Sequence, residues 1–225
     1  LELGVPFSDP MADGPTIQRA STRALRAGTT PQVLLGVLRR LTRRVRVPLV
    51  LLSYWNPIIQ FGGRTNGTRD ARAFLRAASR AGVSGLIVPD LPLEEAGLLR
   101  QAAKACRIAT IFLAAPTSPP SRLRQIARCS DGFIYYVSVT GTTGARKRLA
   151  PDLVRQIRQI RLLTTKPICV GFGISTPQQA RAVAHVADGV IIGSALLDAM
   201  ERSGGSRTRA IRAATAFVRR FREAV

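Results

Sequence analysis

The sequence predicts an α/β fold in which parallel strands and helices form an eight-stranded βα barrel, (β/α)8, with its first βα unit missing from this chain. Two observations predict it. Short apolar runs alternate along the chain with longer stretches of helical periodicity, which is typical of βα units around a parallel sheet. Glycine and polar residues also recur just after the strand ends, where a βα barrel carries its site. An open doubly wound sheet is the competing architecture.

Strands are expected where apolar runs are bounded by turn residues, at 1–4, 48–52, 85–88, 109–113, 132–138, 167–171 and 189–192. Helical periodicity lies between them, at 16–27, 31–44, 69–81, 93–105, 120–128, 151–162, 176–186 and 195–201, with a closing amphipathic run at 208–223. Seven strands are one βα pair short of the barrel, and since the first residue is Leu1 rather than Met, we expect that pair upstream. A single TIM-barrel domain over residues 1–225, N-terminally incomplete, is therefore predicted.

The composition restricts the possible partners. A net charge of +21 and a pI near 11.7 raise nucleic acid as a partner, but all except three of the 34 basic residues are arginines spread over the helix patterns. Solvated helix faces explain this better, so no nucleic-acid partner is expected. No apolar run is long enough for a bilayer and no secretory signal is visible, which favours a cytoplasmic protein without membrane contact. Three cysteines without CxxC spacing predict reduced thiols and no metal site.

Few residues are suited to acid–base chemistry. The single histidine, His185, falls late in a helix pattern, away from the carboxyl-terminal face of the expected barrel. Carboxylates, tyrosine or lysine must therefore supply the proton transfers. Among the 13 carboxylates, those near strand carboxyl ends are Glu2, Asp9, Asp13 and Asp90. Asp90 has a second interpretation, in which it ends a strand and prepares the next helix.

Glu2 is the strongest candidate for a catalytic acid–base group. It alternates with Leu1 and Leu3, so it points into the barrel mouth if the leucines face the helices. Burial there would raise the pKa of its carboxyl group toward the useful range. An interior glutamate paired with an arginine is the alternative. Three prolines stiffen the following loop, which carries Asp9 and Asp13 and is shaped to lie over a ligand.

Three glycine-containing turns predict a phosphate site. They are TGTTGAR at 140–146, GFGIS at 171–175 and IIGSA at 191–195, and the last two follow the final two strands and precede helices. Backbone N–H groups at such turns bind anions, and βα barrels commonly hold phosphate after the last two strands. Each turn alone could simply connect a strand to a helix, but the three together favour a site that binds a phosphate ester.

In order, these motifs resemble the tryptophan synthase alpha chain family. LELGVPFSDPMADGPTIQ carries the most specific resemblance, and VPDLPLEE, YYVSVTGTTGAR, VGFGIST and DGVIIGSAL follow at the family's spacing. The resemblance runs from residue 1 to about residue 200. It implies a barrel of the ribulose-phosphate-binding type and a lyase of L-tryptophan biosynthesis. The implied reaction is retro-aldol cleavage of indole-3-glycerol phosphate to indole and glyceraldehyde 3-phosphate, without a cofactor.

The resemblance also implies site residues. Glu2 matches the catalytic glutamate, and Asp13 matches the aspartate that engages the indole N–H. The phosphate-binding positions match Gly144, Gly173, Gly193 and Ser194. The indole-lining positions match Leu52, Leu113, Tyr135 and Phe172. Thr143 matches the threonine of a loop at about 139–150 that closes over substrate and supports the Asp13 loop.

The family further implies an αββα heterotetramer with a beta chain that carries pyridoxal phosphate and receives indole. No pyridoxal phosphate is expected in this chain, and the loops at 6–14 and 56–63 are expected to face the beta chain. Two other functions stay open. One is a truncated or degenerate alpha chain that only binds and activates a beta chain. The other is another phosphate-binding barrel, such as indole-glycerol-phosphate synthase or phosphoribosylanthranilate isomerase, which would require a lysine or cysteine base at a strand end.

Overall fold

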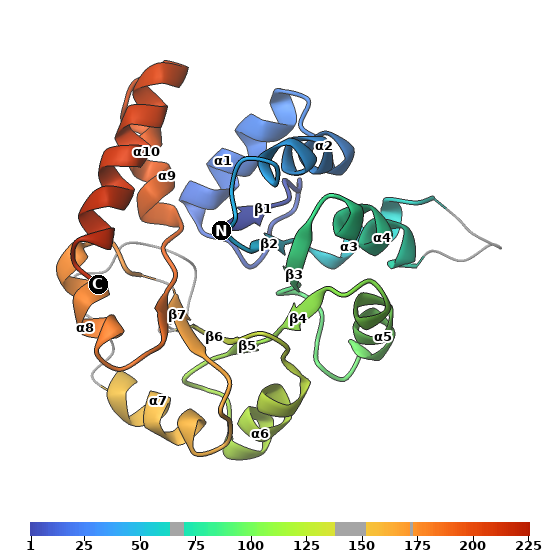
Figure 1. Ribbon diagram of the computed structural model, residues 1–225, viewed down its shortest axis with the longest axis vertical. Helices are drawn as coiled ribbons and strands as arrows, with labels where there is room; N and C mark the ends of the chain where they lie inside the picture. Colours follow the sequence, from blue (N-terminus) through green and yellow to red (C-terminus); the bar gives the residue numbers. More distant parts are fainter. Residues whose placement is uncertain (64–69, 138–151, 172) are drawn as a thin grey trace. The chain divides into compact units, whose positions relative to one another are not determined.

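The computed structural model divides the described part of the chain into two compact units (Figure 1). The described residues are 1–63, 70–137, 152–171 and 173–225. Unit 1 comprises residues 1–12, 21–112 and 129–132, and unit 2 comprises residues 13–20, 113–128 and 133–225. The single domain expected over residues 1–225 stays a prediction.

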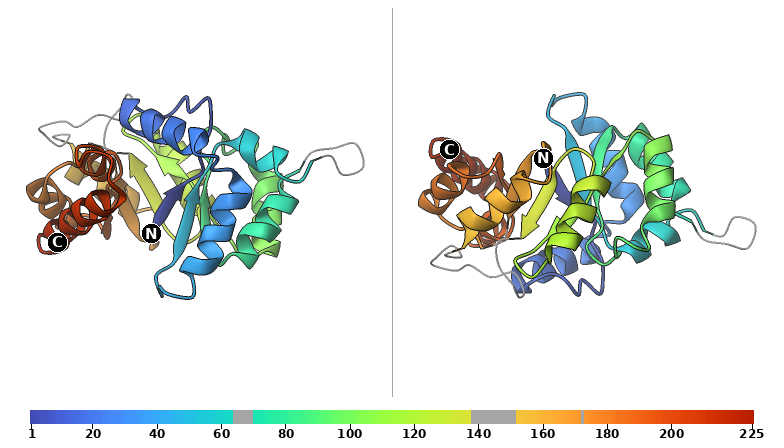
Figure 2. Two further views of the ribbon diagram at one scale, coloured as in Figure 1. Left: turned by 90° about the horizontal axis from the view of Figure 1, so that it is seen from above. Right: turned by 90° about the horizontal axis from the view of Figure 1, so that it is seen from below.

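Unit 1 is built on a parallel sheet with the strand order β1-β2-β3-β4. These strands are Glu2–Gly4, Leu49–Leu52, Val83–Ile87 and Ala109–Ile111. The helices are α2 (Pro31–Leu41), α3 (Trp55–Gln60), α4 (Arg72–Arg80), α5 (Gly97–Ala105) and the part of α1 (Pro15–Arg26) from Ser21 onward. Figure 2 shows α2, α4 and α5 on one side of this sheet.

The core of unit 1 depends on the alternation of side chains along β2. Leu49 and Leu51 are buried, whereas Val50 and Leu52 are only half-buried, so the two faces of the strand differ. The buried side chains that helices α2 and α4 contribute are Leu35, Leu38, Phe74, Leu75 and Ala78. Burying each large apolar side chain contributes about 1.5–3 kcal/mol, so this layer holds the strands in register.

The strand expected at 109–113 is interrupted in the structure. It forms β4, which belongs to the sheet of unit 1, and β5 (Leu113–Ala114), which belongs to the sheet of unit 2. Between them, the Phe112 N–H donates to the buried Ser130 Oγ at 3.2 Å. Because a side chain takes this backbone donor, the sheet ladder ends at Ile111.

Unit 2 contains the second parallel sheet, with the order β5-β6-β7-β8. After β5, its strands are Ile134–Val137, Ile168–Gly171 and Gly189–Val190. Its helices are α6 (Pro120–Cys129, whose last residue groups with unit 1), α7 (Leu153–Arg161), α8 (Pro177–Ala184), α9 (Ser194–Glu201) and α10 (Arg207–Arg222). On α10, Phe217 and Phe221 are buried and stack with their ring centroids 4.5 Å apart.

All seven expected strand positions carry strands, and a helix lies within or at each expected helical segment, with bounds shifted by a few residues. Helix α3 was not expected, because residues 56–63 were predicted to form a loop. Proline is tolerated there because it lies in the first turn, where the backbone N–H has no partner within the helix.

Asp188 joins the starts of β7 and β8. Its Oδ2 accepts hydrogen bonds from the Ile168 N–H at 2.8 Å and from Arg161 Nη2 at 2.9 Å. Its own N–H donates to the Ile168 carbonyl at 2.9 Å. The hydrogen bond from the Ile168 N–H, followed by the Arg161 guanidinium, holds the pKa of the Asp188 carboxyl below its ordinary value. The ionised carboxylate therefore stabilises the strand pair.

We expect Asp188→Asn to lower the free energy of unfolding by about 1 kcal/mol at pH 7, because the charge-assisted hydrogen bonds weaken. A folded-state pKa below the unfolded value gives stability that is present above the unfolded pKa and is lost as the pH falls through the folded pKa. The difference between the two proteins should therefore shrink under acid conditions. Urea denaturation across this range measures it.

Asp152→Asn is the matched control, since Asp152 forms an exposed pair with Arg155 at 3.5 Å. It should change stability by less than about 0.5 kcal/mol. A difference between native protein and Asp188→Asn that grows on acidification would contradict the assignment.

Candidate functional site

Some of the predicted site residues that the structure describes lie at or just after the carboxyl end of a strand, whereas Glu2 and Leu113 begin their strands and Tyr135 is the second residue of β6. Leu52 ends β2 and Leu113 begins the short β5, while Gly173 follows β7 and Gly193 follows β8. Thr143, Gly144, Phe172 and the loop at 139–150 lie outside the described residues. Because the strands of each sheet are parallel, their carboxyl ends meet at one edge of that sheet.

Glu2 begins β1, where it pairs in register with Val50 of β2. Residues in register point to the same face of a sheet, so Glu2 shares the less buried face with Val50, opposite to Leu51. Glu2 therefore lies on the opposite face of the sheet from Leu3 and Leu51. The expected burial of Glu2 is not observed, since its side chain is exposed at the first residue of β1.

The loop after β1 is held by side chains at two points. The Phe7 N–H donates to Ser21 Oγ at 2.9 Å, and the Ser21 hydroxyl donates back to the Phe7 carbonyl at 3.0 Å. The Ala12 N–H donates to the hydroxyl of the buried Tyr54 at 2.9 Å. The Phe7 and Tyr54 rings also lie 5.5 Å apart. These contacts fix the loop up to the residue before Asp13.

Asp13 is half-buried and precedes α1 by two residues. Its carbonyl accepts a hydrogen bond from Gln18 Nε2 at 2.9 Å, and the Gln18 N–H donates to the Gly14 carbonyl at 3.0 Å. The backbone of Asp13 is thus tied to the first turns of α1. Asp9 is exposed and accepts a hydrogen bond from the neighbouring Ser8 hydroxyl, so local solvation explains it.

Tyr135 and Leu113 lie side by side in the sheet of unit 2. They are in register across β5 and β6, and the Tyr135 side chain is 5% exposed. A Cβ atom at Gly171 of β7 would lie 2.6 Å from the Tyr135 hydroxyl oxygen and 2.8 Å from its ring. Only glycine therefore leaves room for this ring at the carboxyl end of β7. Gly171 was not predicted as a site residue, although it belongs to the GFGIS turn.

The two helices that follow the glycine turns differ in their N-terminal hydrogen bonds. Thr176 caps α8, and Gln179 Oε1 accepts from the N–H groups of Ser175 and Thr176 at 2.8 and 3.1 Å. Helix α9 begins after Gly193 without any side-chain cap among the described residues. A Cβ atom at Gly193 would meet no heavy atom within 4 Å. The start of α9, at Ser194, therefore offers uncapped N–H groups and open space for an anion.

Asp90 follows β3 and anchors a neighbouring helix. Its two carboxylate oxygens accept from the Trp55 N–H at 2.9 and 3.1 Å, at the first residue of α3. Burial raises the pKa of this carboxyl group, and hydrogen bonds from the Trp55 N–H and from its own backbone N–H oppose the rise. The structure thus favours the second interpretation, in which Asp90 prepares a helix.

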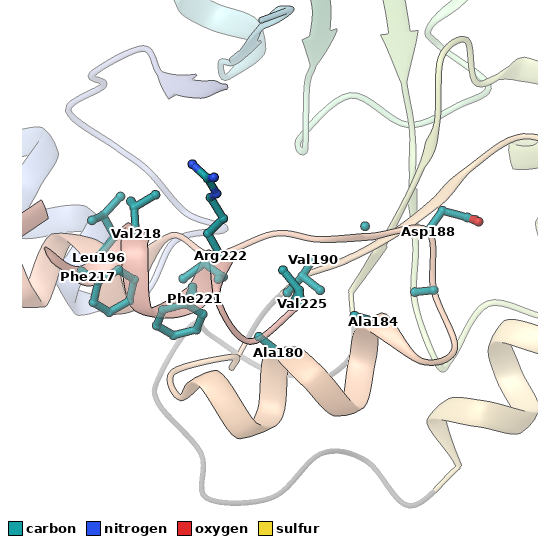
Figure 3. Close-up of a pocket in the computed structure, with 13 residues that line it drawn as sticks. Ala180, Ala184, Asp188, Val190, Leu196, Phe217, Val218, Phe221, Arg222 and Val225 are labelled. Carbon is teal, nitrogen blue, oxygen red and sulfur yellow. The ribbon is translucent and has the colours of Figure 1, made fainter. Parts of the chain in front are cut away.

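A pocket of about 490 Å³ lies in unit 2 among α8, β8, α9 and α10 (Figure 3). Apolar side chains such as Val190, Leu196 and Phe217 line it. None of the predicted site residues lines this pocket, and its carboxylate, Asp188, is engaged by Ile168 and Arg161. It is therefore separate from the candidate site.

Other kinds of site find no support in the described residues. They contain no group of three or more His, Cys, Asp and Glu side chains that could hold a metal ion. The three cysteines are free thiols, as expected, and burial raises the pKa of Cys169 to about 11. No helix in this part of the chain is long and apolar enough to cross a membrane.

Comparisons with known proteins agree with one another. The family model described as "Tryptophan synthase alpha chain" matches residues 1–225. The tryptophan synthase alpha chain of Gloeobacter violaceus is 52% identical over 196 residues, which cover 87% of this chain and 68% of that protein. The crystal structure of subunit alpha from Legionella pneumophila has a TM-score of 0.86 at 36% identity, covering 100% of this chain and 80% of that one. A tryptophan synthase α2β2 complex from Pyrococcus furiosus matches with a TM-score of 0.86 at 35% identity, covering 99% and 86%.

The helix-anchoring role of Asp90 is open to a fluorescence test, since Trp55 is the only tryptophan of the sequence. We expect Asp90→Ala to shift the Trp55 emission spectrum, because the N–H at the start of α3 loses its acceptor. The free energy of unfolding should fall by about 1–3 kcal/mol.

Asp70→Ala serves as the control, because Asp70 accepts from the Arg72 N–H at 2.8 Å at the start of α4. It removes a similar helix-end hydrogen bond and should leave the emission unchanged. Identical spectra for the native protein and Asp90→Ala would refute the anchoring role.

Proposed function

The chain belongs to the tryptophan synthase alpha chain family, and from this premise we propose which of its residues carry the family's reaction. That reaction is a carbon–carbon lyase step of tryptophan biosynthesis, the cleavage of indole-3-glycerol phosphate to indole and glyceraldehyde 3-phosphate. The alpha subunit of this family needs no cofactor. The match of the family model over residues 1–225 is the observation that carries the function.

We propose that the α/β fold of this chain is specifically a βα barrel. Its support is the TM-score of 0.86 to the Legionella alpha subunit, together with parallel pairing in both sheets. In such a barrel the residues at the carboxyl ends of the strands face the substrate. We therefore assign the roles of the site residues to that edge of each sheet.

The phosphate of the substrate is assigned to the turns after β7 and β8. Gly193 and Ser194 would bind it through the uncapped start of α9, where the helix dipole also favours an anion. Gly173, with a φ of 77°, shapes the turn before α8. Gly144 is assigned to the same phosphate on the family resemblance alone. Since α8 is occupied by its own cap, α9 is the main anion-binding helix of this proposal.

The indole ring is assigned to Leu52, Leu113, Tyr135 and Phe172. Two observations support the assignment of Leu113 and Tyr135. These two residues are in register on adjacent strands, and Gly171 leaves space for the Tyr135 ring. Thr143 is assigned, on the resemblance, to the loop that closes over bound substrate and excludes water. These residues bind and orient the substrate rather than transfer protons.

Glu2 and Asp13 are assigned the proton and charge steps. The Glu2 carboxyl group, in its acid form, donates its proton to indole C3 and becomes a carboxylate. The protonated ring carries positive charge on its nitrogen, and the Asp13 carboxylate stabilises this charge at the N–H. The Glu2 carboxylate then removes the proton of the glycerol hydroxyl next to the ring. As that hydroxyl becomes an aldehyde, the bond to C3 breaks and its electron pair restores the aromatic indole.

The proposed partner is a tryptophan synthase beta chain in an αββα assembly. Its support is the solved α2β2 complex from Pyrococcus furiosus, whose matching chain is 35% identical. Pyridoxal phosphate is assigned to the beta chain, which would receive the indole. A cytoplasmic location follows from the same biosynthetic role and is part of the proposal.

An indole-release assay with indole-3-glycerol phosphate and a beta chain tests Glu2. We expect Glu2→Gln to lower kcat by about 10²–10⁴-fold, the usual contribution of a general acid–base group. The circular dichroism spectrum should be unchanged, since an exposed side chain adds little to the core.

Asp9→Asn is the control, because it removes an exposed carboxylate from the same segment of unit 1 and should keep native kcat. Equal turnover by the native chain and Glu2→Gln would exclude the catalytic role. Activation of the beta chain without any indole release would instead favour a chain that only binds and activates its partner.

Gly171→Ala tests the assignment of Tyr135 to the indole pocket. Its Cβ would lie 2.6 Å from the Tyr135 hydroxyl oxygen, so the ring must move. We expect KM for indole-3-glycerol phosphate to rise about tenfold and the unfolding free energy to fall by about 1–3 kcal/mol.

Gly97→Ala at the start of α5 is the matched control, since a Cβ there meets no atom within 4 Å. It should leave KM unchanged. An unchanged KM in Gly171→Ala as well would remove Tyr135 from the indole pocket.

A further inference from the structure

Helices α1 and α9 are joined by a group of polar side chains in unit 2. The Thr16 hydroxyl of α1 donates to Asp198 Oδ1 of α9 at 2.9 Å. Arg19 places its Nε and Nη2 on the Glu201 carboxylate at 2.9–3.3 Å, and its Nη2 lies 3.6 Å from Asp198 Oδ1. These four residues, Thr16, Arg19, Asp198 and Glu201, are called the α1–α9 clamp below.

The charges of the clamp are unfavourable within their own helices. Glu201 is the last residue of α9, where the helix dipole disfavours a carboxylate. Arg19 lies in the first half of α1, a helix whose first turn has no acidic residue. Each charge is therefore stabilised by the neighbouring helix rather than by its own. The bonding of one guanidinium to both oxygens of Glu201 also fixes the direction of approach.

No fully buried side chain joins these two helices to each other. Neither α1 nor α9 contains a fully buried side chain. Core helices such as α4 are instead fixed by several buried residues. The separation between α1 and α9 therefore depends on the polar clamp.

The clamp lies about one helical turn from two proposed site residues, Asp13 just before α1 and Ser194 at the start of α9. Asp13 precedes Thr16 by three residues, and Gln18 holds the Asp13 carbonyl on the same turn. Ser194 precedes Asp198 by four residues on α9, a rise of about 6 Å. The clamp thus connects the residue assigned to the indole N–H with the helix end assigned to the phosphate.

We infer that the α1–α9 clamp sets the distance between the indole end and the phosphate end of the substrate site. It selects a ligand in which an indole ring and a phosphate are joined by a chain of three carbon atoms. Thr16, Arg19, Asp198 and Glu201 are positioning residues, and they touch neither end of the ligand. The inference rests on the proposed function, because it takes the roles of Asp13 and Ser194 from it.

A substitution in the α1–α9 clamp should therefore weaken the binding of ligands that reach both the indole end and the phosphate end of the site. The binding of ligands that occupy only one of these ends should be nearly unchanged. Exposed ion pairs contribute little to stability, and the Arg19 side chain is 52% exposed. A small misplacement of two binding groups, however, has a large effect on a ligand that must reach both. The signature of the clamp is thus this difference between ligands rather than a loss of stability.

The test uses the full chain with its beta chain and three ligands. One is an uncleavable analogue with indole and phosphate joined by a saturated three-carbon chain, and the others are indole and glycerol 3-phosphate. We expect Thr16→Val to weaken the spanning analogue and kcat/KM for indole-3-glycerol phosphate about tenfold each. Binding of each single-end ligand should change less than twofold. Thr16→Ser keeps the hydroxyl and should restore native values.

Thr215→Val is the matched control, since the Thr215 hydroxyl donates to the Ile211 carbonyl within its own helix. Arg19→Gln should repeat the effect of Thr16→Val, and Arg155→Gln, which removes another exposed ion pair, should not. Equal weakening of all three ligands by Thr16→Val, or no weakening of any, would overturn the clamp. Failure of the native chain to cleave indole-3-glycerol phosphate would instead overturn the proposed function.

Discussion

Within the described residues, each of the two sheets is built only from parallel strand pairs, and a parallel pair requires a crossover that returns the chain past the sheet. The helices supply these crossovers, so all strand ends of one kind meet at one edge of a sheet. In unit 2, the Tyr135 ring, the Gly173 turn and the start of α9 belong to that carboxyl edge. Residues separated by more than fifty positions in the sequence therefore come to one edge because of the direction of the strands alone.

The ends of the helices then decide what that edge can bind. No described helix has an acidic residue in its first turn, whereas most have a basic residue in the last turn. This arrangement complements the helix dipole at one end and leaves the other end open to an anion. Helix α8 closes its open end with Thr176 and Gln179, but α9 has no such cap. The last-turn arginines also account for part of the large positive charge of the chain.

The positions of the strands could be predicted from the sequence, because buried parallel strands are short apolar runs between turn residues. The sequence was not sufficient where a single side chain changes the local outcome. Ser130 takes the N–H of Phe112 and so divides one expected strand between two sheets. Residues 56–63 were predicted to form a loop, although α3 occupies Trp55–Gln60. The exposure of Glu2 depends on what surrounds the start of β1, which a local pattern does not contain.

In the candidate site, too, some residues could be recognised from sequence motifs, whereas others were identified only from their contacts in the structure. Glycine turns and carboxylates were visible in the sequence, but Gly171 became important only through its distance from the Tyr135 ring. Thr16 and Asp198 are 182 positions apart and carry no motif, so only the fold brings them together. Neither α1 nor α9 has a fully buried residue, and the contact between these two helices is made by polar side chains. Helices held in this way can adjust by small amounts at little cost in stability, and a site that depends on them is sensitive to geometry more than to the strength of the fold.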